Sequence, residues 1–327
     1  MASEHADARF QSALAPLMEQ FVQEKRACGY RYLSSARTLA GFDRFLLDQA
    51  LAAADLPWSV TGKWLAKRPH ESAATHRDRI CVVRQFTLFL CRQGYRADVP
   101  NELLGAKKEV EFSPRILTRA ELAKLLQAVD QLTPTARSPL RHLIMPEVFR
   151  LLCGCGFRLG EVLQLRLADV DLQQGVLTVR DGKFGKDRLV PPALTLVLRL
   201  RTYAERFGAR PPEAFFFPSP NGGPLHLRTV YFWFRKLLLQ CGIPHAGRGK
   251  GPRVHDLRHG FAVHTLLRWY HEGADLEAKL PVLATYLGHR SLAGTQRYLH
   301  LTAELFPEIT VRANAAFGDV IPRRTAP

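Results

Sequence analysis

The chain has no hydrophobic run that approaches the roughly 18 residues needed to cross a bilayer, so nothing in it predicts a membrane-spanning helix. Its first residues, MASEHADARF, also lack the cationic and then apolar layout of a secretory signal. We therefore expect a soluble, cytoplasmic protein that has no membrane partner.

Cysteine is scarce and scattered, with six residues in a chain of 327. None forms the C-x-x-C pairs that are typical of zinc sites, and the density is far below that of secreted disulfide scaffolds. Cys153 and Cys155 are too close together in the sequence to bridge readily, which favours packing as small apolar side chains. The pattern predicts reduced thiols and no metal site. Internal repeats and low-complexity tracts are absent as well.

Acidic residues are in deficit, because 30 Asp and Glu stand against 46 Lys and Arg, for a net charge of +16. Such an excess favours a polyanionic partner, nucleic acid before an anionic membrane surface. The excess of basic residues is present in both parts of the chain. Residues 1–110 carry 16 basic and 12 acidic side chains, and residues 111–327 carry 30 and 18. Both parts are therefore predicted to contact DNA.

The length predicts two domains or one large one. The segment 100–114, PNELLGAKKEVEFSP, interrupts the helical periodicity and favours two. We interpret this segment as a linker. Residues 1–110 show apolar residues at helical spacing, with Ser35 as the expected cap of the second helix, and they predict a small all-helical domain.

Residues 111–327 are predicted to be mainly helical with one small β element. Thr118 and Glu121 have the spacing of a capping box before a helix. Residues 175–192, GVLTVRDGKFGKDRLVPP, place β-branched residues on both sides of a glycine-bearing turn, which is typical of a hairpin. The predicted fold class is therefore mainly α with a small β-sheet or hairpin.

Several polar side chains of this second domain have the chemistry for work on a phosphodiester. They are Arg158, Lys183, His255, Arg258, His289 and Tyr298. Two guanidinium groups can hold the non-bridging oxygens and stabilise the charge of a pentacoordinate transition state. A tyrosine can attack phosphorus and form an ester that conserves the bond energy, and a lysine can protonate the departing 5′ oxygen. Taken singly, each residue is as consistent with a packing, capping or solvated role.

Four motifs that occur in order carry a resemblance to a known family. They are GFRLGEVLQLRLADVD, GKFGKDRLVP, HDLRHGFAVH and LGHRSLAGTQRYLHL, and the resemblance covers about residues 118 to 301. The chain resembles the tyrosine recombinases, also called the phage integrase family. The resemblance implies an N-terminal helical, SAM-like core-binding domain over residues 1–110 and a catalytic domain over residues 111–327. It also implies an enzyme that cuts and rejoins DNA strands without a metal or cofactor.

The resemblance further implies a role for each motif residue. Arg158 and Arg258 would hold the scissile phosphate, and His255 would act as acid and base. Lys183 would be the general acid for the leaving oxygen. Phe184 stands where the family often has glycine, so Lys186 remains an alternative to Lys183.

The last motif supplies the nucleophile. Tyr298 would form a 3′-phosphotyrosyl bond, His289 would donate a hydrogen bond to the phosphate, and Glu161 would brace the site from behind. The segment after Tyr298, TAELFPEITVRANAAF, would dock as a helix on a neighbouring protomer in a homotetramer assembled on two DNA sites. When bound to DNA the protein would be associated with the nucleoid.

Other interpretations remain open at this point. A zinc site at His255, His259 and His264 is disfavoured because no Glu stands between the first two, as in H-E-x-x-H. A non-catalytic DNA-binding protein and a type IB topoisomerase share the motifs or the chemistry. Within recombination, the long spacer between residues 268 and 286 favours integration, excision or transposition of a mobile element over Xer-like dimer resolution.

Overall fold

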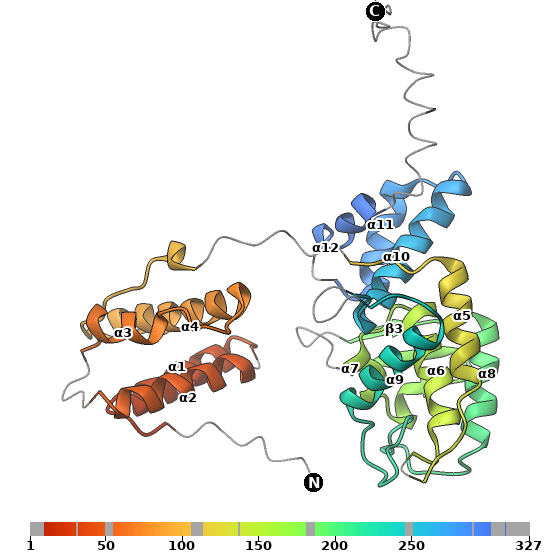
Figure 1. The fold of residues 1–327 in the computed structure, drawn as a ribbon, viewed down its shortest axis with the longest axis horizontal. Coiled ribbons are helices and arrows are strands. Elements are labelled where there is room, and N and C mark those ends of the chain that lie inside the picture. The colour runs from red at the N-terminus through yellow and green to blue at the C-terminus, as the bar shows by residue number, and fades with distance from the viewer. Residues whose placement is uncertain are drawn as a thin grey trace, which may run out of the picture. The chain divides into compact units, whose positions relative to one another are not determined.

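The computed structural model describes residues 10–30, 32–49, 55–105, 114–136, 138–180, 187–245, 251–289, 291–301 and 311. The chain divides into two compact units, Met1–Phe112 and Ser113–Pro327 (Figure 1). Lys183, Lys186 and, apart from Val311, the segment after Tyr298 that was predicted to dock on a neighbouring protomer lie outside the described residues.

The first unit is helical in its described part. Its α-helices are α1 Ala15–Ala27, α2 Leu33–Leu47, α3 Trp58–Leu65 and α4 Ala73–Arg92. Helix α4 packs against each of the other three, and phenylalanines from α1, α2 and α4 fill the core between them. The short helix α3 was not predicted, because its eight residues are too few for a clear periodic pattern.

The start of α2 differs from the prediction. The helix begins at Leu33 rather than after Ser35, and its first flanking residue, Tyr32, is in the left-handed conformation with φ 52° and makes no side-chain cap. The Tyr32 ring lies edge-on against Phe21, with ring centroids 5.6 Å apart. The start of α2 is therefore marked by packing of the Tyr32 ring, and not by the predicted Ser35 hydroxyl cap.

Part of the predicted linker belongs to the first unit. The 3-10 helix η1, Glu102–Leu104, packs on α4. Arg84 of α4 donates to the Pro100 carbonyl at 2.8 Å and to the Glu102 carboxylate at 3.1 Å. The segment that joins the two units therefore begins after Gly105 at the earliest.

A buried ion pair fixes the connection between α3 and α4. Arg79, only 5% exposed, donates to both carboxylate oxygens of Glu71 at 2.6 and 2.7 Å. It also donates to the carbonyls of Trp64 and Ala66 at the end of α3. The hydrogen bonds from Arg79 lower the pKa of Glu71 to about 2. The carboxylate is therefore ionised at neutral pH, and the pair contributes to stability there.

Arg79→Met is expected to lower the free energy of unfolding of the first unit by about 3 to 5 kcal/mol, because it leaves Glu71 buried without its partner. Urea unfolding of the full chain, followed by tryptophan fluorescence, measures this change. The matched control is Arg92→Met on the same helix, whose pair with Glu24 is exposed and contributes at most about 1 kcal/mol. Equal effects of the two variants would contradict the assignment.

The second unit contains the remaining elements. Its helices are α5 Arg119–Asp130, α6 Arg141–Gly154, α7 Leu159–Gln164, η2 Leu167–Asp169, α8 Leu194–Glu205, α9 Leu227–Gln240, α10 Val254–His271, α11 Leu276–Leu287, α12 Ala293–Gln296 and η3 Arg297–Leu301. Its strands are β1 Val170–Asp171, β2 Val176–Val179 and β3 Arg188–Val190, paired antiparallel in the order β1-β2-β3. The predicted fold class, mainly α with a small sheet, is confirmed.

Local signals account for two of these elements. Thr118 caps α5 through a complete capping box, in which its hydroxyl accepts from the Glu121 N–H and the Glu121 carboxylate accepts from the Thr118 N–H. The predicted hairpin is present as β2 and β3, with Leu177 opposite Val190. Strand β1 adds a third member that was not predicted, because two residues are too short to show alternation.

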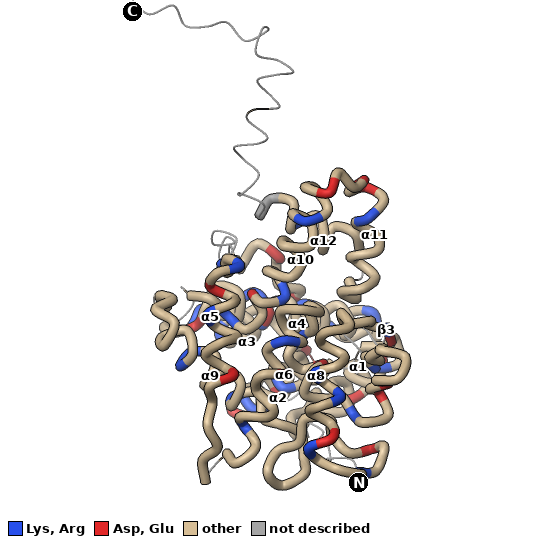
Figure 2. The backbone as a smooth tube through the Cα atoms, turned by 90° about the vertical axis from the view of Figure 1, so that its right-hand side faces the viewer, with Lys and Arg blue, Asp and Glu red and all other residues tan. Residues whose placement is uncertain are grey.

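Helix α6 runs through the centre of the second unit and packs against α5, α7, α8 and α10 (Figure 1). It ends just before Gly156, and the chain turns there into α7. Figure 2 shows basic and acidic positions interspersed over many elements, so the net charge does not come from one described segment. None of the described helices is long and apolar enough to cross a membrane.

Candidate active site

The buried carboxylate of Glu161 lies between two arginines, Arg158 and Arg188, and forms an ion pair with each. Arg158 immediately precedes α7, and Glu161 in the first turn of that helix accepts from the Arg158 backbone N–H at 2.9 Å and from its guanidinium at 2.7 Å. Arg188 of β3 donates to the two oxygens of Glu161 at 3.0 and 2.7 Å. Burial raises the pKa of Glu161, but hydrogen bonds from Arg188 and Arg158 outweigh it and lower the pKa to about 2.

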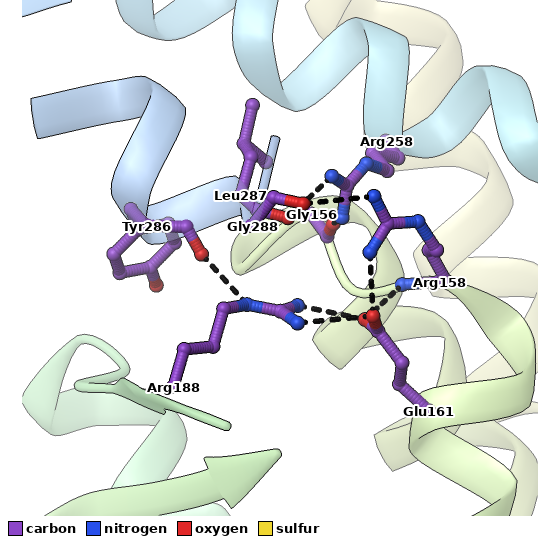
Figure 3. Close-up of polar contacts among 8 residues, drawn as sticks. All are labelled: Gly156, Arg158, Glu161, Arg188, Arg258, Tyr286, Leu287 and Gly288. Carbon is purple, nitrogen blue, oxygen red and sulfur yellow. Dashed lines mark hydrogen bonds and ion pairs between the residues drawn. The ribbon is translucent and has the colours of Figure 1, made fainter. Parts of the chain in front are cut away.

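Three arginines that lie far apart in the sequence converge on the C-terminus of α11 (Figure 3). The donor and acceptor pairs are Arg188 to the Tyr286 carbonyl at 3.0 Å, Arg258 to the Leu287 carbonyl, and Arg158 to the Gly288 carbonyl at 3.1 Å. A helix C-terminus presents unpaired carbonyls and partial negative charge, so cationic donors stabilise it. We call this set of contacts the carbonyl clasp. It joins α11 to α7, β3 and α10.

Two glycines make the close approach possible. Gly288 ends α11 with φ 69°, and a Cβ there would lie 3.0 Å from the Arg188 side chain. Gly156 has φ 64°, and a Cβ there would lie 2.6 Å from the ring of Phe261. Its carbonyl accepts a hydrogen bond from Arg258 at 2.7 Å. Residues with side chains would be strained at these φ values and would meet their neighbours.

Arg258 is the most deeply buried cation of the site, with 1% of its surface exposed. Burial, together with the charge of Arg158, lowers its pKa to about 10, so it remains cationic at neutral pH. Two of its hydrogen bonds go to the carbonyls of Gly156 and Leu287. A guanidinium has five N–H donors, so donors remain for an anionic ligand.

Tyr298, in η3, directs its hydroxyl into this cationic cluster. Its ring is 4% exposed and packs among apolar residues of α10 and α11. Its oxygen lies 3.1 Å from Nδ1 of His259 on α10. The pKa of Tyr298 is raised above its ordinary value, because burial outweighs the lowering by Arg258, through its charge and a hydrogen bond, and by the charges of Arg297 and Arg158. A packing tyrosine would not require this polar environment.

Two imidazoles, of His259 and His289, contact the phenol, and a third, of His255, contacts His259. His289 stacks on the Tyr298 ring at 5.9 Å between centroids and uses Nδ1 for the Thr295 hydroxyl at 2.8 Å. His255 is exposed and touches the ring of His259 edge to face at 4.6 Å. The pKa of each of these histidines is lowered to about 4, first by desolvation and then by neighbouring positive charges. All three are therefore neutral at pH 7.

The predicted residues that the structure describes come together in one region. They are Arg158, Glu161, His255, Arg258, His289 and Tyr298. For Lys183 the structure gives no placement, because residues 181–186 lie outside the described ranges.

The zinc alternative has little support in the geometry. His264 is bonded to the Leu117 carbonyl at 2.9 Å, and the described residues include no group of three or more His, Cys, Asp or Glu arranged to hold a metal ion.

Two residues of the site were missed from the sequence. Arg188 follows the lysine turn and is predicted only as part of a strand, although GKDRLVP places this cation two residues after Lys186. His259 was considered only as a metal ligand, although it stands four residues after His255 on the same helix. An i, i+4 spacing puts the two imidazoles on one helix face, which was the available signal.

Comparison with known proteins bears on what this arrangement does. Residues 115–304 match the phage integrase family. The chain belongs to this family. It is 33% identical over 316 residues to the putative integrase/recombinase y4rB of Sinorhizobium fredii, a match that covers 94% of this chain and 99% of that protein. It is 34% identical over 287 residues to the tyrosine recombinase XerD of Proteus mirabilis, covering 83% and 84%.

The fold agrees with this membership. The structure of the XerH site-specific recombinase bound to a palindromic difH substrate matches with a TM-score of 0.62 and 21% identity, over 90% of this chain and 83% of that one. As a tyrosine recombinase, the chain is a site-specific recombinase, an enzyme that exchanges DNA strands.

Proposed function

We propose that this recombinase cleaves DNA through attack of Tyr298 on a phosphodiester, which leaves a 3′-phosphotyrosyl bond. The observation that carries the proposal is the position of the Tyr298 hydroxyl. It lies 3.1 Å from Nδ1 of His259 and close enough to the buried Arg258 for this cation to act on the pKa of Tyr298 in the lowering direction. An apolar packing role would leave the hydroxyl with neither a base nor a cation beside it.

The arginines supply the electrostatic part of the reaction. Arg158 and Arg258 are anchored by the carbonyl clasp and by Glu161, so their guanidinium groups are held in place before DNA arrives. Preorganised cations of this kind stabilise the charge that grows on the phosphoryl oxygens without reorganisation during the step. In this proposal His289 adds a donor to the phosphate, His255 serves in acid and base steps, and Lys183 protonates the leaving 5′ oxygen.

We further propose that the DNA is double-stranded and that four copies assemble on two sites. In this assembly residues 1–110 form the core-binding domain, and the segment after Tyr298 forms the contact between protomers.

The biological role proposed is integration, excision or transposition of a mobile element, carried out by the protein bound to DNA in the nucleoid. The likeness to XerD favours a second candidate, dimer resolution. Sequencing DNA trapped on the protein in cells distinguishes the two, because mobile-element ends and one fixed chromosomal site give different patterns.

The trapped sequence also supplies the substrate for the decisive test. A nicked suicide duplex that loses a short fragment after cleavage is expected to accumulate a covalent complex with the wild type and none with Tyr298→Phe. Denaturing gel electrophoresis measures the complex. Tyr203→Phe is the matched control, because it removes the hydroxyl of another buried tyrosine, one that donates to the Phe216 carbonyl. Equal trapping by wild type and Tyr298→Phe would refute the role of Tyr298.

A further inference from the structure

The contact between His259 and Tyr298 places a ring nitrogen at hydrogen-bond distance from the hydroxyl of the proposed nucleophile. The 3.1 Å distance joins Nδ1 of His259 to the phenolic oxygen. A phenol must lose its proton when its oxygen bonds to phosphorus, and a base at hydrogen-bond distance accelerates that transfer. We propose, resting on the function assigned to Tyr298, that His259 accepts the phenolic proton as the phosphotyrosyl bond forms.

The other two imidazoles are less suited to this role in the described structure. His289 faces the ring of Tyr298 in a stacked arrangement and has its Nδ1 bonded to Thr295. His255 meets the ring of His259, and no hydrogen bond joins it to Tyr298 among the described residues. His259 is therefore the histidine in direct contact with the reacting oxygen.

The proton balance of the step is simple. The O–H bond of Tyr298 breaks and its proton moves to Nδ1 of His259, while the tyrosyl oxygen bonds to phosphorus and the bond from phosphorus to the 5′ oxygen breaks. The leaving oxygen takes a proton from the general acid, which the proposed function assigns to Lys183. Rejoining runs the same transfers in reverse, so His259 returns its proton to the phenol.

The charges around His259 explain why this transfer waits for DNA. Desolvation lowers its pKa to about 4, with further lowering by His255, Arg253 and Arg258 against an opposing effect of Asp256. A phosphate held at the site brings negative charge that offsets the charges of Arg253 and Arg258 and favours the protonated imidazole. The imidazole is thus neutral and ready to accept before binding, and a stronger base once the scissile phosphate is in place.

Two substitutions separate proton acceptance from simple positioning. His259→Ala removes the contact, whereas His259→Asn places an amide oxygen near the position of Nδ1, where it accepts the hydrogen bond but not the proton. Both are expected to slow single-turnover cleavage of the suicide duplex by about 100-fold or more, with DNA affinity changed less than about threefold. His264→Gln, on the same helix but bonded to Leu117, is the control expected to cleave as the wild type does.

A second substrate distinguishes a base from an acid. A 5′-bridging phosphorothiolate has a sulfur leaving group that departs without protonation, so it restores cleavage to variants that lack the general acid. The His259 variants are expected to stay slow on this substrate. Recovery of His259→Asn to near wild-type rates on ordinary DNA, or rescue of both variants by the phosphorothiolate, would overturn the proposal.

Thermal unfolding of each variant establishes that it folds, and His259→Asn, the more conservative change, keeps the test valid when His259→Ala does not fold. Failure of this inference is distinguishable from failure of the proposed function. A wild type that forms no covalent complex would refute the function itself, whereas normal cleavage by His259→Asn would refute only the role of His259.

Discussion

Replacing Arg258 by alanine is expected to reduce strand cleavage by about 10³-fold or more, the size of effect seen when an arginine that stabilises phosphoryl-transfer charge is removed. Two losses combine in this variant. The scissile phosphate loses a buried cation, and the carbonyls of Gly156 and Leu287 lose their donor. Buried acceptors without partners destabilise the fold, so α11 and the residues that follow it, including His289, should be less well held.

Single-turnover cleavage of the suicide duplex, with DNA binding measured in parallel, tests this prediction. Arg258→Lys keeps the charge but not the forked geometry that reaches two carbonyls at once, and it should remain severely impaired. Arg268→Ala is the control, because it makes the same substitution on α10 at an exposed arginine that lies 3.8 Å from Glu272. Cleavage by Arg258→Ala within tenfold of wild type would show that the phosphate is held by other groups.

The second large effect is expected from Glu161→Ala, which leaves Arg158 and Arg188 close together without the carboxylate between them. Removing one member of a buried ionic network costs about 3 to 5 kcal/mol. The free energy of unfolding of the second unit should fall by that amount. Cleavage should also fall, because the Arg158 guanidinium loses the contact that orients it.

The test is a double-mutant cycle in urea unfolding. Glu161→Ala and Arg188→Met are each expected to destabilise strongly, and the double variant should be more stable than the sum of the two effects predicts, because the residues act as a unit. Additive effects would show that Arg188 and Glu161 are energetically independent despite bond lengths of 2.7 and 3.0 Å.

The pH dependence of stability provides a further test of the ion pair between Glu161 and Arg188. The folded-state pKa of Glu161 is lowered from 4.5 to about 2, so its contribution to stability is complete above pH 4.5 and is lost as the pH falls toward 2. Wild-type stability should therefore decline through that window. The decline should be shallower in Glu161→Ala, which has already lost the contribution.

Local structure was largely predictable because it depends on neighbours in the sequence. The capping box at Thr118 and the hairpin of β2 and β3 are determined by residues within a few positions of one another. The predictions failed where local signals were weak or were outweighed. Helix α3 is too short to show periodicity. Helix α2 starts beside Tyr32, whose ring packs on Phe21 of the preceding helix α1.

The sequence by itself determined the family, because its motifs occur in a specific order with specific residue types. The same motifs predicted Arg158, Arg258, His289 and Tyr298 as site residues. The sequence also determined the mainly helical fold through apolar spacing. Only the tertiary structure decided which neighbours complete the site. Arg158 meets the Gly288 carbonyl across 130 residues, and the contact of Tyr298 with His259 spans 39.

Contacts of this kind leave no periodic trace, because they depend on where folded elements end in space. The C-terminus of α11 gathers three arginines only after α7, β3 and α10 have packed around it. Arg188 and His259 both stand within motifs, but the proposed roles of Arg188 as an anchor and of His259 as a proton acceptor rest on that packing.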